Sequence, residues 1–170
     1  MQHGRDPAFD DAPAEFLVVS HQDGLGVAYV GRVCLVVWRR AVTLERFDRQ
    51  RRALKALAER HPDGIGFLCV IEPTAPPPDA EMRKASQLMI AELKDQLRCV
   101  ACALEGQGNY IDAARNALAN MALLARLSAP VMRFVPSVEA AAAWVAQRVD
   151  AAVASDLVKA HARLVERMDA

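Results

Sequence analysis

Hydrophobic residues gather in short runs, separated by turn signals, over residues 15–38. Strand-like runs cover residues 16–19, 26–30 and 33–38, and the turns between them contain Gly24 and Gly31. The run at 33–38 is apolar at successive positions, which is typical of a strand buried on both faces. The pattern predicts two or three antiparallel strands, with the last of them central in a sheet.

From Thr43 onward the spacing of apolar residues changes to a helical period. Thr43 is expected to cap a helix that carries Phe47 and Leu54 on one face and ends at the His61-Pro62-Asp63-Gly64 turn. A buried strand follows over 64–72. Asp79 is then expected to cap a second helix that reaches about Leu97.

The same alternation continues along the rest of the chain. A strand over 99–104, a helix over about 110–127, a strand over 131–135 and a helix capped by Ser137 complete an α-β-α-β-α-β-α order. Such an order predicts an α/β domain with a mostly parallel sheet behind its antiparallel start. We expect one domain over 15–149, preceded by a disordered lead-in at 1–14.

An extra amphipathic helix is predicted over 150–170. Its apolar stripe consists of Val153, Leu157, His161, Leu164 and Met168. This helix either covers the domain's own core or pairs with another chain as a homodimer.

Composition narrows the classes of function. The 170 residues contain 21 Lys+Arg and 21 Asp+Glu, and only 5% of them are aromatic, which argues against nucleic-acid binding. No apolar run approaches the roughly 20 residues that span a bilayer, and the acidic lead-in is not a signal peptide. We therefore expect a cytoplasmic protein without a membrane span.

The four cysteines fit the same expectation. Cys34, Cys69, Cys99 and Cys102 lie in or at the end of apolar strand-like runs, which favours buried, reduced thiols. Cys99 and Cys102 have the Cys-x-x-Cys spacing, but on a strand two positions three apart point to opposite faces. We expect no disulfide, no metal site and no cofactor.

A proline loop between the strand at 64–72 and the following helix is the first candidate site. Partners and ligands of open α/β sheets bind beyond the carboxyl ends of the strands, and this loop lies there. Successive prolines stiffen it. The candidate partner-binding residues are Glu72, Thr74, Pro76, Pro77, Pro78, Asp79 and Arg83.

A glycine-rich turn after the strand at 99–104 is the second candidate. Glu105, Gly106, Gln107 and Gly108 would lie between a strand and a helix, where backbone N–H groups can hold an anion. The alternative is an ordinary tight turn. Glu72 and Glu105 would end adjacent parallel strands, as candidates for acid–base work, as exposed charges, or as partners for Arg83.

Other charged and titratable residues carry weaker signals. Arginines at 39, 40, 46, 49, 51 and 52 form either a solvated surface or a patch for an acidic partner. No complete hydrolytic constellation is visible, because His21 is the only histidine expected near the sheet. His161 falls on the extra tail.

The stretch 130–145, PVMRFVPSVEAAAAWV, together with the order of elements over 15–149, resembles the STAS domain of bacterial anti-sigma-factor antagonists. The resemblance implies a partner-binding module. In regulated members a partner kinase phosphorylates a serine at the start of the helix after the loop. Here the loop has no serine pair, and Thr74 is its only hydroxyl.

Three hypotheses follow. The first is a non-enzymatic, STAS-like protein-interaction module that acts in bacterial signalling, with a kinase or regulator as its partner. The second is a domain that binds a small molecule or lipid in a cavity at the same sheet edge. The third is an enzyme that uses Glu72 and Glu105, and it ranks last because no catalytic constellation is complete.

Overall fold

The computed structural model of the chain describes residues 15–106, 112, 116 and 131–170. Within these residues, one six-stranded mixed sheet has a strand order that follows the chain from β1 to β6. The strands are β1 (Phe16–Ser20), β2 (Leu25–Val30), β3 (Val33–Trp38), β4 (Ile65–Ile71), β5 (Leu97–Leu104) and β6 (Met132–Val135). The first three pair antiparallel, and β3 to β6 pair in parallel. The predicted α/β class and the central position of the third strand are confirmed.

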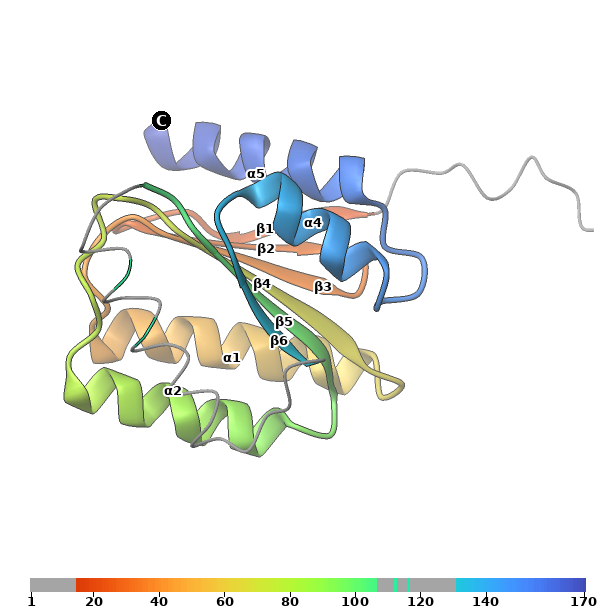
Figure 1. The fold of residues 1–170 in the computed structure, drawn as a ribbon, viewed down its shortest axis with the longest axis horizontal. Helices are drawn as coiled ribbons and strands as arrows, with labels where there is room; N and C mark the ends of the chain where they lie inside the picture. Colours follow the sequence, from red (N-terminus) through yellow and green to blue (C-terminus); the bar gives the residue numbers. More distant parts are fainter. Residues whose placement is uncertain (1–14, 107–111, 113–115, 117–130) are drawn as a thin grey trace, which may run out of the picture.

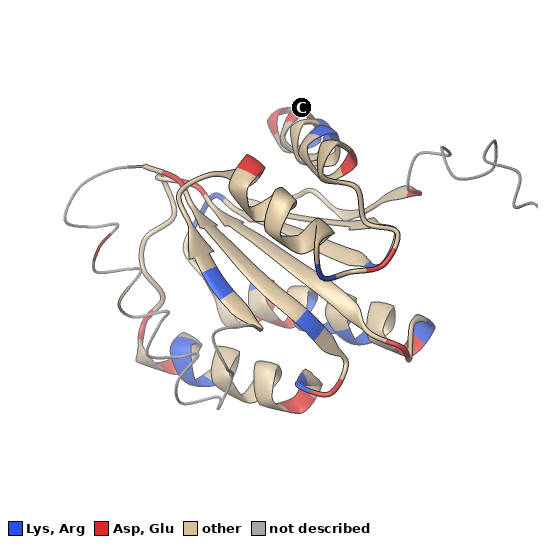
Figure 2. Ribbon diagram, turned by 45° about the vertical axis from the view of Figure 1, so that its right-hand side comes forward, with Lys and Arg blue, Asp and Glu red and all other residues tan. Residues whose placement is uncertain are grey.

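Helices cover both faces of this sheet (Figure 1). On one face lie α1 (Leu44–Arg60) and α2 (Ala80–Leu93), and on the other lie α4 (Val138–Ala146) and α5 (Ala154–Asp169). Two apolar clusters result, one in each interface between helices and sheet. Figure 2 shows charged residues mainly on the helices and in the connections, while β3 and β4 contain none.

The predicted N-caps are confirmed. The hydroxyls of Thr43 and Ser137 accept hydrogen bonds from backbone N–H groups three residues later, at 3.3 and 3.2 Å. The Asp79 carboxylate accepts from the Met82 N–H at 2.9 Å. Each bond satisfies one of the backbone donors that a helix leaves open in its first turn.

The second helix is shorter than predicted. It ends at Leu93 rather than near Leu97, and Leu97 is instead the first residue of β5. The carbonyl of Gln96 already accepts a 2.8 Å hydrogen bond from the N–H of Ile65, which draws the chain into the sheet at that point. No proline or glycine marks this boundary, so the local sequence did not indicate it.

The C-terminal helix α5 packs on the chain's own sheet. Its residues Leu157 and Leu164 are fully buried against β2, β3 and α4. Gly26 of β2 allows the close approach, because a Cβ there would overlap Leu164 and Met168. Of the two alternatives for the tail, the structure shows the first: Leu157 and Leu164 of the stripe cover the chain's own core, whereas Val153 at its start is 49% exposed.

Two predicted segments lie largely outside the described residues. Of the expected helix over 110–127, only Asp112 and Asn116 are described, and both are helical. The lead-in at 1–14 is not described at all. Within the part that is described, no helix is long and apolar enough to cross a membrane.

Candidate functional site

The proline loop leaves the carboxyl end of β4 and is fixed by hydrogen bonds near both ends. The Thr74 hydroxyl donates to the carbonyl of Arg39 at 2.8 Å, and the Ala75 N–H donates to the Glu72 carbonyl at 3.0 Å. Near the far end, Arg83 Nη1 donates to the carbonyl of Pro78 at 3.0 Å. The loop is therefore held in one conformation.

The outer side of this loop faces solvent. Pro73, Pro76 and Pro77 are exposed, whereas Ala75 turns inward and is buried. On the adjoining helix α2, Leu88 is 63% exposed. The loop and α2 thus present several apolar groups on a fixed backbone.

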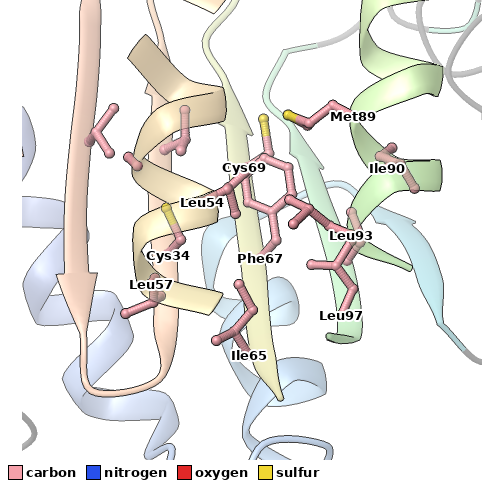
Figure 3. Packing of buried hydrophobic residues seen from close by; sticks show 14 of the residues in the cluster. Cys34, Leu54, Leu57, Ile65, Phe67, Cys69, Met89, Ile90, Leu93 and Leu97 are labelled. Carbon is pink, nitrogen blue, oxygen red and sulfur yellow. The ribbon is translucent and has the colours of Figure 1, made fainter. Parts of the chain in front are cut away.

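Beneath the loop, between the sheet and helices α1 and α2, lies a cavity of about 80 Å³. Its walls come from β3, β4, β5, β6, both helices and the loop. They are formed by Trp38, Val42, Phe47, Gln50, Phe67, Cys69, Ile71, Ala75, Pro76, Pro77, Pro78, Ser86, Met89, Ile90, Val100, Cys102 and Met132. Figure 3 shows Phe67 and Cys69 of β4 facing Met89 and Ile90 of α2 in this apolar layer.

Gln50 is the only buried polar residue within the described part of the chain, and it lies in this wall. Its Oε1 accepts a 2.8 Å hydrogen bond from Trp38 Nε1, and its Nε2 contacts Met89 Sδ at 3.8 Å. Both ends of the amide are engaged, as a buried polar group requires. The cavity therefore offers mainly apolar contacts to whatever enters it.

All four cysteines are buried and free, as predicted. Cys99 and Cys102 point to opposite faces of the sheet, whereas Cys69 and Cys102 are register neighbours on the cavity face. A hydrogen bond to Cys102, together with burial, raises the pKa of Cys69, and burial raises the pKa of Cys99 to about 11. These two groups are neutral thiols at neutral pH, so neither is an activated nucleophile.

On the opposite face, a row of charged residues follows the carboxyl ends of the parallel strands. Trp38, Ile71 and Leu104 are in register, so the next residues, Arg39, Glu72 and Glu105, form a row toward α4 and α5. The hydrogen bonds between neighbouring strands continue into this row. The Glu72 N–H donates to the Trp38 carbonyl at 2.9 Å, and the Glu105 N–H donates to the Ile71 carbonyl at 3.1 Å.

Arg39, at the β3 end of this row, is bound by two carboxylates. Its Nε and Nη2 bond the two carboxylate oxygens of Glu72 at 2.7 and 3.1 Å, and its Nη1 bonds Asp169 of α5 at 2.6 Å. The pKa of Arg39 is raised, chiefly by its hydrogen bonds to Glu72. Of the alternatives for Glu72, pairing with Arg83 is not the one that the structure shows, because Arg83 bonds the Pro78 carbonyl. Both Glu72 oxygens serve the contact with Arg39.

Helix α5 also brings His161 to this edge, where the sequence did not place it. Its Nε2 is buried without a hydrogen-bond partner. Burial lowers the pKa of His161, and the nearby carboxylates of Glu105, Glu72 and Glu139 oppose that shift. The only signal in the sequence was the position of His161 in the apolar stripe of the tail.

The glycine-rich turn is described only in its first half. Glu105 ends the ladder, and Gly106 has a φ of 109°, a conformation that favours glycine. Gln107 and Gly108 lie outside the described residues, so anion binding at this turn stays a prediction. Across the described ranges, no group of three His, Cys, Asp or Glu side chains is placed to hold a metal ion.

The basic residues near α1 are largely paired within the chain. Arg46 and Arg49 both contact Asp23, at 2.9 and 3.1 Å. Arg51 and Lys55 both contact Glu92 of α2, at 3.4 and 2.7 Å. These contacts link α1 to its neighbours and neutralise much of the patch that was a candidate surface for an acidic partner.

Comparison with known proteins gave no match to any protein-family model, curated protein or solved structure. The resemblance to the STAS domain thus rests on the sequence pattern alone.

Proposed function

We propose that this chain is a non-enzymatic protein-interaction module of the STAS-like type, which acts in bacterial signalling or regulation. Its recognition surface is the loop 72–79 together with the exposed side of α2. The observation that carries the proposal is an exposed apolar loop, held rigid by hydrogen bonds, directly above a small apolar cavity.

Rigidity is the first supporting argument. A surface that is already fixed loses little conformational entropy when a partner binds. Four prolines restrict the loop backbone, and the contacts of Thr74 and Arg83 hold the loop against the end of β3 and against α2.

The size of the cavity is the second argument. Cavities of about 150 Å³ hold a benzene molecule, so the 80 Å³ here suits only a smaller apolar group. A lipid or a cofactor-sized ligand needs several times that space. A pocket that accepts the end of one apolar side chain from a partner is typical of an interface hot spot. The volume thus favours a protein partner over the small-molecule alternative.

The test begins with capture in the cells that make this protein. A photo-crosslinking amino acid replaces the exposed Glu81 at the start of α2 and, as a control, the exposed Arg167 on α5. We expect an adduct with one defined protein from position 81 only. If position 167 captures the same protein equally well, the proposed surface is wrong.

The captured partner is then purified and titrated against the full chain and two leucine variants. We expect Leu88→Ser to weaken binding about tenfold, because a hot-spot side chain contributes more than about 1 kcal/mol. The matched control is Leu17→Ser on β1, where the leucine is 47% exposed but remote from the loop. A small molecule that copurifies with the chain in native mass spectrometry, with no partner captured, would instead favour the ligand-binding alternative.

A further inference from the structure

At the opposite end of the sheet from the proline loop, three arginines meet around a polar hollow of about 630 Å³. Arg32 comes from the β2–β3 turn, Arg98 from the start of β5, and Arg148 from the segment just after α4. Asp63, Gly64, Val149 and Asp150 complete the lining. We propose that this hollow is a binding site for a phosphate-bearing anion.

Arg98 is held in place by the backbone of the turn before β4. Its Nε donates to the carbonyl of Asp63 at 2.8 Å, and its Nη2 donates to the same oxygen. The guanidinium lies over Gly64, which has a φ of 120° and where a Cβ would overlap the Arg98 side chain. An arginine has five N–H donors, so this anchoring leaves further donors for a ligand.

Arg148 is held by an aromatic ring and a carbonyl. Its guanidinium carbon lies 4.0 Å from the centre of the Trp144 ring, and its Nη1 donates to the Trp144 carbonyl at 3.2 Å. Stacking of this kind fixes the plane of the guanidinium without cancelling its charge. Two of the three arginines are therefore positioned before any ligand arrives.

Charge favours an anion in this hollow. For Arg32 and Arg98, the described chain offers no carboxylate within ion-pair distance, in contrast to Arg39, Arg46 and Arg49. Asp63 and Asp150 line the same hollow, so three guanidinium groups face two carboxylates.

The geometry favours a phosphate group over a carboxylate. A phosphate group has several acceptor oxygens directed in different ways, so it can accept paired N–H donors from guanidinium groups that approach from separate elements. A flat carboxylate matches one such fork well, but not three. The site is independent of the proline loop, so either proposal can fail without the other.

The test uses inorganic pyrophosphate as the probe, titrated calorimetrically into the full chain at low ionic strength in a buffer free of phosphate and sulfate. We expect one site, with affinity that Arg32→Gln and Arg98→Lys each weaken about tenfold or more, because charge-assisted hydrogen bonds are lost. Arg98→Lys retains the charge, so its effect reports the guanidinium fork rather than net charge.

The matched control is Arg167→Gln, which removes one positive charge from α5, on a surface away from the hollow. Equal weakening in this control would reveal diffuse attraction and overturn the proposal. Absence of binding at millimolar pyrophosphate would overturn it too. Amide shifts of Gly64 and Val149 in NMR spectra, without shifts in the proline loop, are the expected local signature.

Discussion

On the α4/α5 face of the sheet, Leu157 and Leu164 fill the space between helix and strands. A row of charged residues lies at the carboxyl ends of the parallel strands on this face. On the α1/α2 face, the same sheet leaves a cavity of about 80 Å³ beneath the proline loop. Under the proposed function, the two faces differ in role: the α5 side is closely packed, and the loop side binds a partner. Substitutions on the α5 side should affect folding, whereas those on the loop side should affect binding.

The largest expected effect is on the tightly packed face. Leu164→Ala should lower the free energy of unfolding by about 2–5 kcal/mol, because it leaves a cavity under α5. Urea denaturation followed by circular dichroism measures the change. Leu88→Ala on the exposed side of α2 is the control, and we expect a change within about 0.5 kcal/mol. Similar losses in both variants would contradict the division between faces.

Next in size is the contact between β3 and β4 at the strand ends. Glu72→Gln should lower the free energy of unfolding by about 1–2 kcal/mol, since it weakens two charge-assisted hydrogen bonds to Arg39 that are mostly shielded from solvent. Glu92→Gln, which affects an exposed contact with Lys55 and Arg51, should cost less than about 1 kcal/mol. Chemical denaturation of both variants decides whether the charged row is the stronger contact.

Adding one methylene to each face compares the packing directly. Val100 lines the cavity, and Val100→Ile should stabilise the protein by about 0.8 kcal/mol by filling it. Val70 is fully buried on the other face, and Val70→Ile should destabilise by about 1–3 kcal/mol through overpacking. Opposite signs in thermal unfolding are the expected result, and a common sign would break the comparison.

The smallest effect concerns pH. Burial lowers the pKa of His161 from its ordinary 6.5, so the folded chain binds this proton less readily than the unfolded chain. The neutral His161 side chain therefore makes its full contribution to folding stability above about pH 6.5, and this contribution is lost as the pH falls below that value. The free energy of unfolding should therefore change less between pH 7.5 and 5.5 in His161→Gln than in the unaltered chain. This range lies on either side of about 6.5, the ordinary pKa of histidine. An unchanged slope would show that His161 is not the group responsible.

Much of the fold could be predicted because its signals are local. Apolar runs located the strands, and Thr43, Asp79 and Ser137 marked three helix starts through their capping side chains. The end of α2 was misplaced, because a hydrogen bond from a distant strand, rather than a glycine or proline, ends it.

The sites were harder to predict, because they depend on which strands become neighbours. Strand order places Arg39 beside Glu72, a pairing that residues 33 positions apart do not reveal. The burial of His161 likewise depends on α5 folding back across the sheet. The proline loop could be found from the sequence because its whole signal lies within eight successive residues, 72–79.

The strand order also bears on how the chain assembles during synthesis. Each new strand is added at the edge formed by the strand made just before it, so the sheet can extend in step with translation. Helix α5 is the exception, since Asp169 reaches back to Arg39 across 130 positions. Until α5 has been synthesised, one apolar face of β2 and β3 lacks its cover. We expect a chain at that stage to be prone to aggregate, because this apolar surface is exposed.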